Sequence, residues 1–141
     1  MDLADTIHHF LFKYGLIKSK LLLAISGGPD SIALLHAFRS KHLFPGLQLA
    51  VAHVDHRWRA ESTNEAALLR EVVESLGIGW HLKVLDPALM KGNLEEASRN
   101  ARLDFFRQLC EKEGFAGVVL AHHADDQAET VLMRLIRGTG S

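Results

Sequence analysis

The feature that most constrains the fold of this chain is a regular alternation between short apolar runs and stretches with helical periodicity. The run Leu21-Leu22-Leu23-Ala24-Ile25 has the pattern of a strand that is buried on both faces, and similar runs recur along the 141 residues. Between these runs, apolar residues repeat at the spacing of one helix face. This order predicts an α/β fold with a Rossmann-like parallel sheet and helices on both faces.

The expected elements can be placed by residue range. The expected strands cover residues 21–25, 47–54, 80–85 and 117–121. The expected helices cover residues 3–14, 29–39, 62–76, 94–113 and about 125–136. Ser62 and Glu65 have capping-box spacing, so a helix is expected to begin there. Right-handed crossovers bring the segments that follow parallel strands to one sheet edge, where ligands bind, so we expect the site in residues 26–31, 53–59, 86–93 and 121–127.

The composition is that of an ordinary soluble globular domain, with 48% hydrophobic and 23% charged residues. A formal net charge of -1 removes whole-chain basicity as an argument for nucleic-acid binding. The lone Cys110 excludes an intramolecular disulfide framework and any all-cysteine metal site or iron–sulfur cluster. Neither a signal peptide nor a membrane-spanning apolar run is present, so we expect a cytoplasmic protein.

The segment Ser26-Gly27-Gly28-Pro29-Asp30-Ser31 follows the first apolar run and begins a helix. Its glycines let backbone N–H groups approach a ligand, its serines add hydroxyl donors, and a helix N-terminus favours an anion. The segment matches neither a Walker A loop nor the G-x-G-x-x-G motif. A simple strand-to-helix turn with an aspartate cap is the alternative, but the serines and the acid together favour a phosphate-binding loop.

This segment resembles the Ser-Gly-Gly-x-Asp-Ser signature of the PP-loop ATP pyrophosphatases, which have an adenine nucleotide alpha hydrolase-like fold. Further similar segments are Ala52-His53-Val54-Asp55-His56, residues 93–102, residues 121–130 and Arg137-Gly138-Thr139-Gly140. In this order they are similar to the N-terminal catalytic domain of the tRNA(Ile)-lysidine synthases. Those enzymes are much longer. We therefore expect residues 1–141 to be a single PP-loop ATPase domain that is truncated at its C-terminus, with the downstream tRNA-binding domains absent.

The resemblance implies a ligase that attaches lysine to C2 of the wobble cytidine 34 of tRNA(Ile), which has a CAU anticodon. ATP first adenylates the C2 oxygen and releases pyrophosphate. The amine of free L-lysine then attacks C2 and expels AMP, which leaves lysidine. The implied cofactors are ATP and Mg²⁺, because a hard cation is needed to bridge the phosphate oxygens.

The roles expected for individual site residues follow from this resemblance together with the chemistry of their side chains. Asp30 and Asp126 are expected to hold Mg²⁺. Arg99 and Arg102 lie three apart and would bind phosphate or the activated cytidine, unless they pair with Glu95 or Glu96 on a solvated helix face. His122 and Asp126 would receive the lysine amine, although a His–Asp helix cap would have the same spacing. We expect catalysis from Asp30, Arg99, His122 and Asp126. We expect nucleotide binding by Ser26, Gly27, Gly28, Pro29, Asp30, Ser31, His53, Asp55 and Arg102.

Three alternatives stay open from the sequence. A different PP-loop enzyme that modifies tRNA or forms amides is one, but thiolation needs more cysteines than Cys110, which falls in the middle of an expected helix. A module that binds ATP without turning it over is the second. A zinc site is the third, built from His53, His56, His122 and His123 plus two acids, although the sequence has no H-E-x-x-H spacing.

Overall fold

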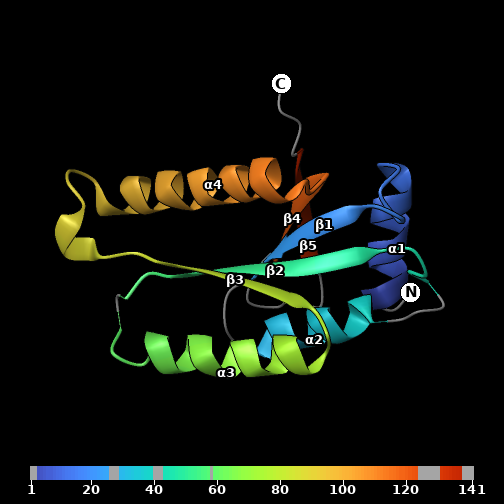
Figure 1. Ribbon diagram of the computed structural model, residues 1–141, viewed down its shortest axis with the longest axis horizontal. Helices are drawn as coiled ribbons and strands as arrows, with labels where there is room; N and C mark the ends of the chain where they lie inside the picture. Colours follow the sequence, from blue (N-terminus) through green and yellow to red (C-terminus); the bar gives the residue numbers. More distant parts are fainter. Residues whose placement is uncertain (1–2, 26–28, 40–42, 58, 124–130, 138–141) are drawn as a thin grey trace.

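The computed structural model, shown in Figure 1, describes residues 3–25, 29–39, 43–57, 59–123 and 131–137. Its elements are α1 (Leu3–Lys13), β1 (Lys20–Ala24), α2 (Pro29–Phe38), β2 (Gln48–Asp55), α3 (Ser62–Ser75), β3 (Gly79–Val84), η1 (Pro87–Leu89), α4 (Leu94–Glu113), β4 (Gly117–His123) and β5 (Val131–Arg137). From Leu3 to Glu113, the expected helices and strands are confirmed to within a residue or two. The short 3-10 helix η1 was not expected.

All the strands join one five-stranded sheet in the order β3-β2-β1-β4-β5. β1 pairs in parallel with β2 on one side and with β4 on the other, and β2 pairs in parallel with β3. The carboxyl ends of β1, β2, β3 and β4 therefore share one edge, as the sequence predicted. Because β2 and β4 flank β1, the direction in which the chain adds strands reverses at β1. The topological switch point lies between the carboxyl ends of β1 and β4.

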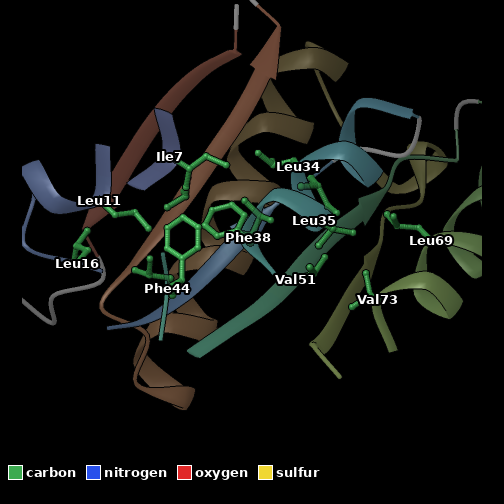
Figure 2. Close-up of a cluster of buried hydrophobic side chains, with 14 residues drawn as sticks. Ile7, Leu11, Leu16, Leu34, Leu35, Phe38, Phe44, Val51, Leu69 and Val73 are labelled. Carbon is green, nitrogen blue, oxygen red and sulfur yellow. The ribbon is translucent and has the colours of Figure 1, made fainter. Parts of the chain in front are cut away.

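One face of the sheet is covered by α1, α2 and α3. Ile7 of α1, Leu35 of α2 and Val73 of α3 are fully buried against Leu23 and Val51 of the central strands. Figure 2 shows this cluster, in which side chains from all three helices point toward the sheet. Each fully buried aliphatic side chain contributes about 1.5–3 kcal/mol relative to an exposed one, so this layer supplies a large share of the stability.

The opposite face is covered by α4 (Figure 1). Phe106, Leu109 and Cys110 of this helix pack with Leu22 of β1 and Val118 of β4. Leu22 and the adjacent Leu23 thus point to opposite faces, and both are buried. This explains why the first strand has a continuous apolar run rather than alternating polar and apolar residues.

Side chains and backbone conformation define both ends of α4. The Asn93 side chain accepts a hydrogen bond from the Glu96 N–H at 3.2 Å and so caps the first turn. Gly114 ends the helix with φ +75°, a conformation that favours glycine, and its N–H donates to the Cys110 carbonyl. These signals are local in the sequence, which is why the bounds predicted for this helix are confirmed.

The capping box expected at Ser62 is wrong. Glu61 is the N-cap of α3 and makes no side-chain capping bond, and the Glu65 carboxylate pairs with Arg59 at 2.6 Å instead. The Ser62 hydroxyl is buried beside the Asp55 carboxylate, outside standard hydrogen-bond geometry. The tertiary environment of Asp55 thus overrides the local pattern.

The helix expected over residues 125–136 is also wrong in its second half. Val131–Arg137 forms β5, which pairs antiparallel with β4, so the sheet is mixed rather than wholly parallel. The run from Val131 to Ile136 is apolar enough to suit either a buried strand or a helix. As a strand it satisfies the backbone groups along the free side of β4, which would otherwise be an open edge. Residues 124–130 lie outside the described residues.

No helix in the described ranges is long and apolar enough to cross a membrane.

Candidate functional site

The predicted site residues follow the carboxyl edge of the sheet, and the structure describes them to different extents. Ser26, Gly27, Gly28 and Asp126 lie outside the described residues. Pro29, Asp30 and Ser31 form the first turn of α2, and His122 lies in β4 opposite Leu132 of β5; for these residues the backbone is described. His53, Asp55, Arg99 and Arg102 are described with their side chains.

His53 lies near the end of β2 and is buried, with 7% of its surface exposed. Its Nδ1 lies 2.9 Å from the carbonyl oxygen of Ile25, the residue that precedes Ser26. Because a carbonyl only accepts, Nδ1 carries the hydrogen and donates it. The imidazole also stacks on the Trp80 indole of β3, with ring centroids 5.8 Å apart and an interplanar angle of 29°. The side chain thus connects β2 with β3 and with the residue that follows β1.

Asp55, the last residue of β2, has a buried carboxylate that organises the turn leading to α3. Oδ1 accepts from the Arg57 N–H at 3.0 Å, and Oδ2 accepts from the Thr63 hydroxyl at 3.4 Å. Arg57 has φ +55°, an unusual value for a residue other than glycine, and this conformation directs its N–H to the carboxylate. Burial raises the pKa of Asp55, but Ser62, Arg57 and Thr63 together lower it below 3.8.

Arg102 on α4 has a guanidinium group without its full set of partners. Its Nε is buried and has no hydrogen-bond partner in the part of the chain that the structure describes. Neither Arg102 nor the exposed Arg99 forms an ion pair with Glu95 or Glu96 within the described ranges. A buried N–H without an acceptor costs about 1–3 kcal/mol, which an anionic ligand at this edge would offset. The pairing with Glu95 or Glu96 that was the alternative for these arginines is thus not observed.

His56 lies beside this guanidinium. Burial lowers the pKa of His56, and the positive charge of Arg102 and the nearby His53 lower it further, against the opposite effect of Asp55. A neutral imidazole therefore lies beside a cationic guanidinium, near the residue that ends β2. The positive charge that could attract an anion here is that of Arg102.

The lowered pKa values of His56 and Asp55 predict that the domain loses stability in acid. The folded-state pKa of His56 lies below 6.5, so the unfolded chain takes up this proton first and stability falls as the pH drops below about 6.5. The stability from Asp55 is present above pH 3.8 and is lost as the pH falls through its lower folded-state pKa. Urea unfolding between pH 7.5 and 3 measures both effects. The loss of stability below about pH 6.5 should be absent in His56→Gln, and the loss below pH 3.8 should be absent in Asp55→Asn.

His36→Gln, at an exposed position on α2, is the control for these variants. If His56→Gln retained the full loss between pH 6.5 and 5, the neutral state of the half-buried His56 would be contradicted.

Sequence reasoning missed Trp80 and Thr63, which touch the two buried polar residues of β2. Trp80 lies opposite Val51 in the pairing of β3 with β2, which brings its ring to the face on which His53 lies. Thr63 reaches Asp55 across the turn before α3. No local pattern marks either residue, because each contact depends on the strand register or on a turn conformation.

The donors expected for a metal ion are carboxylates, which fit Mg²⁺ by their chemistry. Asp30 lies in the first turn of α2, which follows β1, and Asp126 follows β4 in the sequence. β1 and β4 are neighbours, so the two acids fall in segments that follow adjacent strands in the sequence. Among the residues that the structure describes, no group of three or more His, Cys, Asp or Glu side chains could hold a metal. Only the backbone of His122 and His123 is described, so the structure does not test the zinc alternative, and the magnesium assignment stays a prediction.

An open α/β sheet with a glycine-rich loop between its central strand and a helix N-terminus defines a class of nucleotide-binding domains. The chain belongs to the PP-loop domain family, an ATP-binding family whose model matches residues 2–141. The resemblance expected from Ser26–Ser31 is thereby confirmed.

Individual proteins are also similar to this chain in sequence. The bifunctional protein TilS/HprT of Listeria monocytogenes serotype 4b (strain F2365) is 42% identical over 147 residues, which cover 99% of this chain and 22% of that protein. The tRNA(Ile)-lysidine synthase of Protochlamydia amoebophila is 37% identical over 139 residues, with coverages of 99% and 30%. That of Chlorobaculum tepidum is 40% identical over 125 residues, with coverages of 85% and 38%. The chain thus spans well under half the length of these relatives.

Among solved structures, the U34-tRNA thiolase NcsA from Methanococcus maripaludis, described with its [4Fe-4S] cluster, has a similar fold. The TM-score is 0.63, with 17% sequence identity, and the match covers 86% of this chain and 45% of that one. At this identity the similarity concerns the fold alone, that is, the arrangement of the sheet and its helices.

Proposed function

We propose that this chain is the ATP-handling domain of a ligase that attaches lysine to C2 of cytidine 34 in tRNA(Ile) with a CAU anticodon. The observation that carries this proposal is the position of the Ser26–Ser31 signature, which joins the carboxyl end of β1 to the first turn of α2 at the switch point of the sheet. The relatives named tRNA(Ile)-lysidine synthase support the particular reaction, since they match this chain at about 40% identity.

The chain would assist the first step by holding the departing pyrophosphate. Backbone N–H groups of the Ser26–Ser31 loop and the first turn of α2 supply donors for its oxygens. Asp30 and Asp126 would hold Mg²⁺, which when bound neutralises phosphate charge. Arg102 would donate its buried Nε–H to a phosphate or to the activated cytidine. These groups favour attack by the C2 oxygen on the α-phosphorus and departure of pyrophosphate.

In the second step, lysine displaces AMP from C2. The attacking amine must be neutral, so a group at the site has to accept its proton. His122 and Asp126 are our candidates, since both belong to the segment at the end of β4. Asp126 would orient the amino group of the incoming lysine, and His122 would accept the proton that this group loses. Both assignments rest on the sequence and on the backbone position of His122.

The proposed reaction can be measured directly with a full-length enzyme that contains this domain. Radiolabelled lysine should enter tRNA(Ile) with a CAU anticodon in an ATP-dependent way, with one AMP and one pyrophosphate released per lysine. GTP should not replace ATP. If ATP is cleaved without lysine incorporation, or if tRNA is thiolated instead, the proposed function is wrong.

Arg102→Met should lower kcat/KM for this reaction by about 10–100-fold, the effect of losing a hydrogen bond to a charged group. Arg102→Lys should restore only part of the activity, because an ammonium does not reproduce the fork of donors in guanidinium. Arg107→Met is the matched control: Arg107 lies on the same helix, is 67% exposed and pairs with Asp104. Equal losses for Arg102→Met and Arg107→Met would argue against a role for Arg102 at the site.

Thiolation, the main alternative, has little support from the side chains of this chain. Cys110 is buried on α4 against the sheet, far along the helix from its N-terminal turns. Burial raises the pKa of the Cys110 thiol, and the adjacent Glu111 raises it further. A buried thiol with a raised pKa is a poor sulfur carrier, because the thiolate is the reactive form.

A further inference from the structure

We infer that His53 is a positioning residue for the phosphate-binding loop, and that its imidazole acts on the loop through Ile25 rather than by touching the nucleotide. This inference rests on the proposed function, since it gives the Ser26–Ser31 loop the task of binding phosphate. It changes the role expected for His53, which the sequence placed among the nucleotide-binding residues.

The pairing of β1 with β2 stops just before the loop. The regular register ends at Ala24 opposite Ala52, whereas β2 continues to Asp55. Ile25 is held beyond that point by two contacts: its N–H donates to the Ala52 carbonyl at 3.2 Å, and its own carbonyl accepts from His53 Nδ1 at 2.9 Å. A side chain therefore holds the last backbone carbonyl before the loop.

Holding this carbonyl restricts how the chain leaves the sheet. The Ile25 carbonyl belongs to the peptide unit that joins Ile25 to Ser26, and a peptide unit is planar. A hydrogen bond to the carbonyl oxygen therefore restrains the orientation of the whole unit from which the loop starts. Loop donors must match the phosphate oxygens closely, and a misplacement of about 1 Å can cost on the order of 10²-fold in rate.

The imidazole is itself held in place. The Trp80 indole stacks on one side of the ring, and the residue is 7% exposed. Val51 and Trp80 lie opposite one another in the sheet, and both belong to the layer beneath α2 and α3. A ring enclosed in this way presents little surface to a nucleotide but keeps its Nδ1–H directed at Ile25. This burial favours positioning over direct contact.

The test compares two substitutions of His53 in the full-length enzyme. His53→Asn retains an N–H donor at nearly the position of Nδ1, whereas His53→Leu removes the donor and keeps a side chain of similar bulk. We expect His53→Leu to raise KM for ATP about tenfold or more and to leave KM for lysine unchanged. His53→Asn should return KM for ATP to within about threefold of the wild-type value. His81→Leu, on β3 and packed on Phe115, is the control and should leave both constants unchanged.

Equilibrium binding separates this inference from the proposed function. Calorimetry with ATP·Mg²⁺ should show weaker binding for His53→Leu and recovery for His53→Asn, whether or not lysine is incorporated into tRNA. If both variants bind ATP as the wild type does, or if both lose binding equally, the positioning role is wrong. Lysine incorporation by the wild-type enzyme tests the proposed function independently, so either idea can fail without the other.

Discussion

Asparagine in place of Asp30 or Asp126 is expected to slow pyrophosphate release by the full-length enzyme about 10³-fold, with tRNA and lysine present. Each substitution keeps the size of the side chain and removes one negative charge, so it weakens Mg²⁺ binding without adding bulk. The two acids belong to segments that follow β1 and β4, which are adjacent strands. Phosphate release assayed with a coupled pyrophosphatase measures the effect.

Asp104→Asn is the control for this pair. Asp104 lies on α4 with 62% of its side chain exposed, and it pairs with Arg107 at 3.0 Å. Its loss should leave the rate within about twofold, as is usual for an exposed ion pair. Raising the Mg²⁺ concentration should partly restore the variants at the metal site and should not affect Asp104→Asn. If pyrophosphate release survived both Asp30→Asn and Asp126→Asn, the metal assignments would be wrong.

Phe106→Ala should produce the largest change in stability, about 3–5 kcal/mol. Phe106 is 2% exposed and belongs to the cluster that joins α4 to the sheet, together with Leu22 and Val118. Removing the ring loses its burial and leaves a cavity that the rigid strands cannot fill. Urea unfolding of the 141-residue chain should show the midpoint falling by about 1–3 M.

Phe12→Ala is the matched control for this change. Phe12 lies on α1 with 66% of its surface exposed, and its ring stacks on His8 at a centroid distance of 6.4 Å. Its removal should cost less than about 1 kcal/mol. Similar losses for the two variants would mean that α4 does not pack on the sheet as the structure describes.

The sequence predicted the elements from Leu3 to Glu113 because their signals are local. The all-apolar run of β1, the asparagine cap of α4 and the glycine that ends it each lie within a few residues of the element that they define. The two errors have the opposite cause. The turn after β2 places the Ser62 side chain beside Asp55 instead of at a helix cap. Val131–Arg137 forms a strand because it pairs with the otherwise open edge of β4. In both cases a partner distant in sequence outweighs the local pattern.

The candidate site, too, could be predicted from the sequence only in part. Its location at the carboxyl edge followed from the order of strands and helices, and its loop from the Ser26–Ser31 signature. The burial of His53 under Trp80 could not be predicted, because Trp80 reaches it only through the register of β3 on β2. The buried Nε of Arg102 likewise depends on how α4 packs against the sheet.

By itself, the sequence determined the α/β class and membership of the PP-loop family, and it predicted a phosphate-binding loop at Ser26–Ser31, since all three depend on short segments with characteristic residues. Only the tertiary structure decided that β4 lies beside β1, that β5 closes the edge of β4, and that His53 holds the Ile25 carbonyl 28 residues away. Contacts of this kind depend on strand order and register, which arise when the whole chain buries its apolar faces together.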